Sequence, residues 1–322
     1  MASHSSKKVI YAAFVGNALI AIAKFVAASI TGSSAMLSEG IHSVVDCGNQ
    51  LLLLFGLRMA AKDPDDEHPF GYGMELYFWT FVVAILIFAL GAGFSIYEGI
   101  ERVRHPEAVA SPMVNYVVLS LSMIFEGVAW TVAFREFQKS RGSYGFIEAV
   151  RKSKDPTVFT VLFEDTAAML GLAVAFAGVA GSHLLEMPVL DGYASIAIGI
   201  ILAVVAVLLA IESKGLLIGE AADPSIVEGI KLIVHEDVRI LRINEVLTMH
   251  LSPNEVLLNA SLDFIDGLPA EEVEAAISQF ELTIKDEYPS ISRVFIEAQG
   301  WRAHLGEQAS SKKKQSAGRK TD

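Results

Sequence analysis

A group of polar residues inside a long apolar stretch has the spacing of a metal site. The segment 35–61 is mostly apolar, yet it contains Glu39, His42, Asp46 and Asn49. Residues three or four positions apart share one face of a helix, so these side chains form a single polar stripe. An imidazole and a carboxylate at this spacing suit a borderline divalent cation such as Zn²⁺. Alternatively, the stripe only hydrogen-bonds a neighbouring helix.

A second acidic group interrupts another apolar stretch. Glu164 and Asp165 are adjacent within the segment 157–181. An ionised carboxylate at bilayer depth costs roughly 2.5–3.5 kcal/mol on insertion scales. A shared cation, a proton or both would relieve the repulsion and desolvation of such a pair. We therefore expect this pair to face the polar stripe.

The composition is that of a membrane protein. Hydrophobic residues make up 52% of the 322 positions, and the mean hydropathy is +0.46, too apolar for an ordinary soluble domain. The net charge of −12 argues against a nucleic-acid partner. The single cysteine, Cys47, excludes an internal disulfide, and it lies about 100° around the helix from Asp46, which favours packing over ligation.

Six segments have the length and apolarity of membrane-spanning helices, and they predict the topology. They are 9–30, 35–61, 76–100, 113–134, 157–181 and 192–211. An even number of spans puts both termini on one side of the membrane. Lys7, Lys8 and the basic loop 135–154 lie on that side, so the positive-inside rule makes it the cytoplasm.

Two further charged residues lie within these spans. Lys24 either extends toward the membrane interface or faces the transport path, and the sequence leaves both interpretations open. Glu126, in the fourth span, is interpreted as a packed or interfacial acid.

The connection 62–74 is irregular because it contains two prolines and two glycines. It nevertheless gathers several metal-ligating side chains, with Asp65 and His68 among them. A solvated acidic loop is the alternative.

Beyond Glu212 the pattern changes to that of a small α+β domain. It predicts helices at 226–234 and 269–288 and strands at 240–251, 255–264 and 292–298, in the order αββαβ. The predicted organisation is a cytoplasmic N-terminal tail (1–8), a membrane domain (9–214), a cytoplasmic domain (215–303) and a disordered tail (304–322).

Three motifs resemble those of the cation diffusion facilitator family. They are GSSAMLSEGIHSVVD at 32–46, HPFGYG at 68–73 and YEGIER at 97–102. The segment 161–171 further resembles the zinc transporter nine branch. The resemblance, which covers about residues 9–300, implies an α-helical membrane protein with six transmembrane helices and a small cytoplasmic, ferredoxin-like-type αββαβ domain.

The family's transport site takes a pair of ligands four residues apart from each of two spans. His42 and Asp46 match the first pair, and Asp165 matches the second residue of the other pair. Val161 stands where the family usually has histidine. The resemblance therefore implies a three-ligand core, for which Glu164 is the nearest replacement ligand, with Glu39 and Asn49 in supporting positions.

The family's secondary sites are matched only in part. In the loop, Asp65 and His68 match, but Tyr72 stands where a second histidine is common. In the cytoplasmic domain His235 and His250 are plausible ligands. At the other positions, where stronger metal ligands are common in the family, this chain has Ser261, Glu297 and Gln299. We therefore expect that site to be weak or absent.

The resemblance implies a homodimer that exports Zn²⁺ from the cytoplasm in exchange for protons by alternating access. Zn²⁺ is expected as substrate, with no prosthetic group, and membrane lipid surrounds the spans. The alternatives are export of Mn²⁺, Fe²⁺ or Co²⁺ and a metal-responsive scaffold that transports nothing. An enzyme is not expected, because no Ser-His or HExxH arrangement appears. The expected location is a bacterial cytoplasmic membrane with both termini in the cytoplasm.

Overall fold

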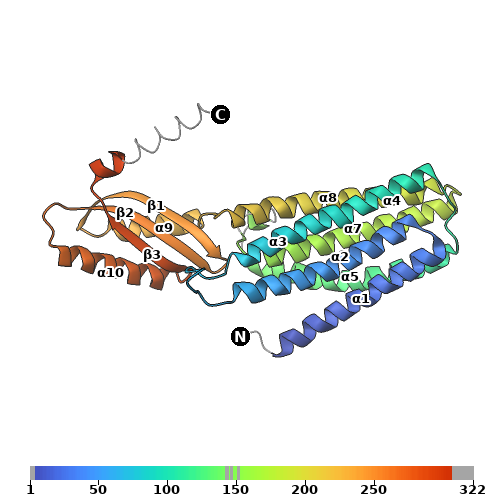
Figure 1. The fold of residues 1–322 in the computed structure, drawn as a ribbon, viewed down its shortest axis with the longest axis horizontal. Coiled ribbons are helices and arrows are strands. Elements are labelled where there is room, and N and C mark those ends of the chain that lie inside the picture. Colours follow the sequence, from blue (N-terminus) through green and yellow to red (C-terminus); the bar gives the residue numbers. More distant parts are fainter. Residues whose placement is uncertain (1–3, 142–144, 146–147, 151–152, 307–322) are drawn as a thin grey trace. The chain divides into compact units, whose positions relative to one another are not determined.

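The computed structural model describes residues 4–141, 145, 148–150 and 153–306. The chain divides into two compact units, Met1–Leu217 and Ile218–Asp322. The first unit is helical, and the second contains a small sheet (Figure 1).

The described helices of the first unit run alongside one another (Figure 1). Five of the six predicted spans each lie in one helix, except that α2 ends at Ala60, one residue before the predicted end of its span. The third predicted span crosses α3, η1 and α4, which follow one another without a break. The helices are α1 (His4–Thr31), α2 (Ser34–Ala60), α3 (Glu75–Leu86), the π-helix η1 (Ile87–Ala92), α4 (Gly93–Arg104), α5 (Pro112–Ser140), α7 (Pro156–Leu184) and α8 (Val189–Leu217).

Four helices of the described chain are long and apolar enough to cross a membrane: Glu75–Arg104, Pro112–Lys139, Phe159–Leu184 and Val189–Leu217. The apolar part of α1 that the structure describes, Asn17–Thr31, is shorter. In α2, the polar stripe lowers the mean hydropathy. The prediction of a helical membrane-type protein is therefore confirmed, with four clear spans.

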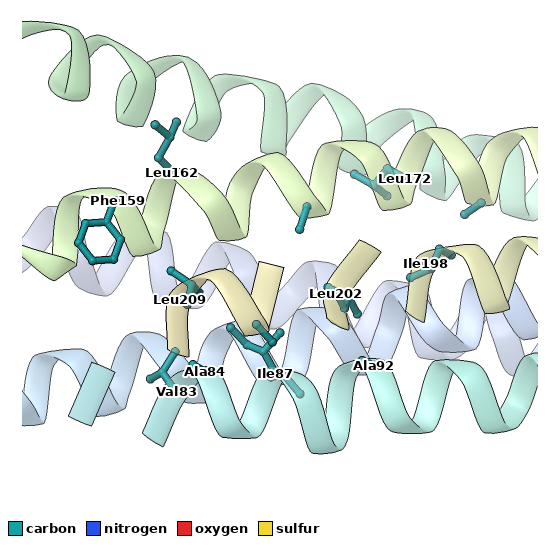
Figure 2. Close-up of a cluster of buried hydrophobic side chains, with 14 of the residues drawn as sticks. Val83, Ala84, Ile87, Ala92, Phe159, Leu162, Leu172, Ile198, Leu202 and Leu209 are labelled. Carbon is teal, nitrogen blue, oxygen red and sulfur yellow. The ribbon is translucent and has the colours of Figure 1, made fainter. Parts of the chain in front are cut away.

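Helix α8 lies at the centre of the packing. It contacts α2, α3, η1, α4 and α7, while α1 packs against α2 and α5. Figure 2 shows the apolar cluster that α8 shares with η1 and α7, in which Ile87, Leu172 and Leu202 are buried. Since lipid is as apolar as these side chains, close packing rather than water exclusion stabilises such contacts. Gly99 of α4 serves this purpose, because a Cβ there would lie 2.8 Å from the carbonyl oxygen of Gly192 in α8.

The start of α2 is anchored to α8 by a buried carboxylate. Asp191 accepts hydrogen bonds from Ser33 Oγ at 2.5 Å and from the backbone N–H of Ser34 at 2.5 Å. Arg102 of α4 lies 3.7 Å from the same carboxylate and donates to the carbonyl of Gly32. These charge-assisted contacts hold α2, and with it the polar stripe, against α4 and α8.

The second unit has the predicted order αββαβ. Its elements are α9 (Pro224–His235), β1 (Ile240–Ser252), β2 (Glu255–Phe264), α10 (Ala270–Glu287) and β3 (Ile291–Ala298). The sheet order is β1-β2-β3, antiparallel between β1 and β2 and parallel between β2 and β3. Alternate residues of β2, such as Val256 and Leu258, are buried in one core with Ile230 and Phe280. Helix α10 makes the crossover that a parallel pair requires.

Several sequence predictions extend beyond what these elements cover. Residues 301–306 form a further short helix, which includes the first three residues of the predicted disordered tail (304–322), and residues 307–322 lie outside the described residues. Arg151 and Lys152 of the predicted basic loop also lie outside them. Helix α1 begins at His4, within the predicted N-terminal tail.

Candidate metal centre

The polar stripe of α2 faces the interior of the helical unit. Glu39 and Asn49 are fully buried, His42 is 2% exposed, and Asp46 is half-buried. His42 Nδ1 lies 3.4 Å from Asp46 Oδ1. The predicted helical spacing therefore places imidazole and carboxylate side by side.

Helix α7 meets this stripe directly. Asn49 Nδ2 donates a hydrogen bond of 2.8 Å to Glu164 Oε1. Further along, a Cβ at Gly171 would collide with Glu39 Oε1, so glycine permits the close approach of α7 to α2. The carboxylate of Asp46 interacts electrostatically with Glu164 and Asp165, which belong to α7. The two acidic groups expected to face each other are thus in neighbouring positions.

Several buried atoms of the stripe have no hydrogen-bond partner among the described residues. They are both ring nitrogens of His42, Asp46 Oδ1, Glu39 Oε1 and Asn49 Oδ1. A buried polar atom without a partner costs roughly 1–3 kcal/mol. Nitrogen and oxygen lone pairs in this setting suit a borderline divalent cation, which would satisfy several of them at once.

These donors are not gathered into a finished coordination site. In the part of the chain that the structure describes, no three His, Cys, Asp or Glu side chains are close enough together to hold a metal ion. Carboxylates without a cation between them repel one another. A metal ion entering the cluster would therefore have to draw its ligands closer together.

The contacts of Lys24 on α1 show whether its side chain extends to the membrane interface, one of the two interpretations that the sequence left open. Its Nζ lies 2.9 Å from Glu39 Oε2 and donates a hydrogen bond of 2.8 Å to Ser43 Oγ. The side chains of Lys24 and Glu39 are both fully buried. Lys24 therefore faces the interior of the helical unit instead of extending to the membrane interface, and it compensates the charge of Glu39.

An open cavity of about 1250 Å³ lies between α1, α2, α5 and α7. Its walls are mostly apolar, but Asp165 and Glu126 line it together with Val161. Glu164 is not among the described residues that line it, since its side chain is bonded to Asn49. Sequence reasoning did not assign Glu126 to the site; the available signal was a single carboxyl group in an otherwise apolar span.

The acidic loop is organised around Asp65 and is exposed. Its carboxylate accepts hydrogen bonds from Tyr72 Oη at 2.7 Å and from the backbone N–H of His68 at 2.8 Å. These bonds lower the pKa of Asp65, the Tyr72 bond contributing most, and the same bond raises the pKa of Tyr72 to about 12. His68 Nδ1 lies 3.7 Å from Asp65 Oδ1. Tyr72 stands where a histidine is common in the family, and its hydroxyl hydrogen-bonds one of the two carboxylate oxygens of Asp65.

In the second unit, two predicted ligands lie in different settings. His250 is buried, with Nδ1 3.2 Å from the carbonyl of Ser252, whereas His235 is exposed at the end of α9. Ser261 Oγ donates to Gln299 Oε1 at 3.4 Å. Gln299 Oε1 also lies 3.0 Å from His304 Nδ1, a contact that the sequence did not predict. Gln299 is thus part of a hydrogen-bond network within this unit.

The family model of the cation efflux transmembrane domain matches residues 10–218. The chain belongs to the cation efflux family. Members of this family are transporters and not enzymes, which confirms that prediction. The matched range runs from within α1 to the end of α8 and includes the polar stripe and the acidic pair on α7.

Three relatives illustrate the range of the family. "Proton-coupled zinc antiporter SLC30A9, mitochondrial" of Xenopus laevis is 34% identical over 262 residues, covering 81% of this chain and 47% of that protein. "Metal tolerance protein C4" of Arabidopsis thaliana is 29% identical over 80% of this chain and 57% of its own length. "Manganese efflux system protein MneP" of Bacillus subtilis (strain 168) is 23% identical over 90% of this chain and 95% of its own. The chain spans about half the length of the first of these relatives, and the resemblance to the zinc transporter nine branch is confirmed.

Proposed function

We propose that this protein exports a divalent metal cation, Zn²⁺ in the first instance, from the cytoplasm in exchange for protons. The observation that carries the proposal is the buried cluster in which unpartnered atoms of His42 and Asp46 on α2 lie opposite the acids of α7. The printed names of the zinc antiporter and metal tolerance relatives support a metal cation as the substrate.

The proposed transport site has His42, Asp46 and Asp165 as its core, with Glu164 as a further ligand and Glu39 and Asn49 in support. Metal ligands must be deprotonated, so a cation that enters a cluster of carboxylates displaces protons. This competition couples metal movement in one direction to proton movement in the other. Because α2 and α7 each supply ligands, a change in their packing would open the site to alternate sides.

We further propose six membrane spans, with the membrane domain at 9–214 and the second domain, 215–303, in the cytoplasm together with both termini. The basic residues on that side support this orientation. The protein would work as a homodimer surrounded by lipid, in a bacterial cytoplasmic membrane. In this orientation Asp65 and His68 lie on the cytoplasmic side and would capture metal for delivery.

Two alternatives follow from specific observations. Val161 removes a nitrogen ligand, so the site is rich in oxygen and suits harder ions such as Mn²⁺, and one relative is named as a manganese efflux protein. Fe²⁺ and Co²⁺ belong to the same alternative. A metal-responsive scaffold is the other, because the second unit is compact in itself and contains none of the proposed transport ligands.

Metal flux into sealed proteoliposomes tests the proposal. The purified full-length protein should move Zn²⁺ across the membrane, faster when an opposing proton gradient is imposed, and excess Mn²⁺ should compete weakly. Vesicles without protein provide the background. If Mn²⁺ suppresses the flux more strongly than unlabelled Zn²⁺ does, the alternative of a transporter for harder ions is favoured. If neither ion is transported, the metal-responsive scaffold is the remaining alternative.

A further inference from the structure

Glu126 is a buried acid without an evident partner in the middle of α5. Its residue is 7% exposed, and within the described residues it makes no hydrogen bond or ion pair. A carboxyl group at membrane depth is costly unless a cation or a proton compensates it. A cation bound by the Glu126 carboxylate would supply this compensation.

The packing of α5 on α7 places Glu126 opposite the proposed transport site. Trp130, four residues further along α5 and so on the same face, donates its Nε1–H to Thr166 Oγ1 at 3.0 Å. Thr166 directly follows Asp165 on α7, and Glu126 lines the same cavity as Asp165 and Val161. The indole–hydroxyl bond thus fixes the packing of α5 on α7 about one helical turn from Glu126 and next to Asp165.

The electrostatic neighbours of Glu126 are the residues of the transport site. Asp165 and Asp46 both interact with its charge, and Lys24 is a further charged neighbour. Glu164, in contrast, is hydrogen-bonded to Asn49 of α2. Glu126, unlike Glu164, is free to turn toward Asp165 through the cavity.

We propose that Glu126 is a direct ligand of the transported divalent cation, in the place that Val161 cannot fill. The cation would then be bound by side chains from three helices, with His42 and Asp46 from α2, Asp165 from α7 and Glu126 from α5. This inference rests on the proposed function and keeps its three-residue core, but it gives the fourth position to Glu126 instead of Glu164, whose side chain is bonded to Asn49. Because α5 then supplies a ligand, α5 must also take part in the conformational change that opens the site to alternate sides of the membrane.

Equilibrium binding of ⁶⁵Zn²⁺ to the purified full-length protein, with flux measured in parallel, tests this ligand. Glu126→Gln should weaken Zn²⁺ binding about tenfold or more, since even outer-shell partners of metal sites contribute that much. The matched control is Glu101→Gln on α4, because Glu101 is exposed, lies 3.5 Å from His105 Nε2 and is not among the described residues that line the cavity. It should leave binding unchanged.

A rescue experiment separates ligation from packing. In the background of Glu126→Gln, Val161→His supplies a nitrogen ligand from α7 and should restore most of the lost affinity. If Glu126→Gln binds Zn²⁺ like wild type, or if Val161→His does not rescue a monodisperse Glu126→Gln protein, Glu126 is not a ligand. If the wild-type protein transports Zn²⁺ and His42→Ala does not, the proposed function stands even though the role of Glu126 fails. If the wild-type protein binds no metal, both the proposed function and the role of Glu126 are overturned.

Discussion

His42 and Asp46 are the side chains on which the proposed transport depends most directly. His42→Ala and Asp46→Ala should each abolish metal flux, because each removes a coordination bond and leaves the charges of the remaining ligands unbalanced. Flux in proteoliposomes measures the effect, and size-exclusion chromatography checks that the variants stay folded. Near-normal flux in either variant would contradict the proposed site.

The loop residues Asp65 and His68 should affect capture more than translocation. Their joint replacement by alanine is expected to raise the apparent KM for Zn²⁺ while the maximum rate changes less, since both are exposed and lie outside the buried cluster. Replacing exposed Asp66 and Glu67 by asparagine and glutamine controls for the general loss of negative charge. An unchanged KM in the Asp65/His68 variant would leave the segment as a solvated connector.

The hydrogen bond between Tyr72 and Asp65 has a measurable pH dependence. It lowers the pKa of Asp65, so its contribution to the loop conformation is present at neutral pH and is lost only as pH falls through that lowered pKa. Tyr72→Phe removes the largest cause and should raise the pKa of Asp65 toward the ordinary value of about 3.9. Carboxyl ¹³C NMR titration measures the shift. No upward shift in Tyr72→Phe would mean that the phenol does not bond this carboxylate in solution.

At the scale of helices, the buried pair of Lys24 on α1 and Glu39 on α2 holds two elements together. Lys24→Met leaves Glu39 buried without compensation, and breaking such a pair costs roughly 3–5 kcal/mol. The double variant Lys24→Met with Glu39→Leu replaces both charges by apolar groups and should recover much of the loss. Thermal unfolding in detergent compares the two. A single variant as stable as wild type would show that the pair does not stabilise the α1–α2 contact.

At the scale of the whole molecule, the two compact units have separate cores. Phe280 is buried in the core of the second unit, and Phe280→Ala should destabilise that unit by about 3–5 kcal/mol. All the proposed transport ligands belong to the first unit. We therefore expect Zn²⁺ affinity to change little while the second unit unfolds at a lower temperature. Calorimetry with a parallel binding measurement tests this, and a loss of both together would indicate that the units are coupled.

The helices, the order αββαβ and the residues of the polar stripe were predictable from the sequence because their signals are local. Apolar runs of spanning length mark the helices, and period-two alternation marks β2. His42 and Asp46 stand out because a helix places residues four apart on one face, and because charged groups in apolar segments are costly. These properties depend on neighbours within one or two turns of the chain.

Which side chains meet across helices was decided only by the tertiary structure. Lys24 pairs with Glu39, and Glu164 is bonded to Asn49 on another helix, while its neighbour Asp165 shares a cavity with Glu126. Adjacent residues on a helix point about 100° apart, so Glu164 and Asp165 must face different neighbours. The rotation and contacts of each helix depend on the packing of all the others, and no local pattern in the chain carries that information.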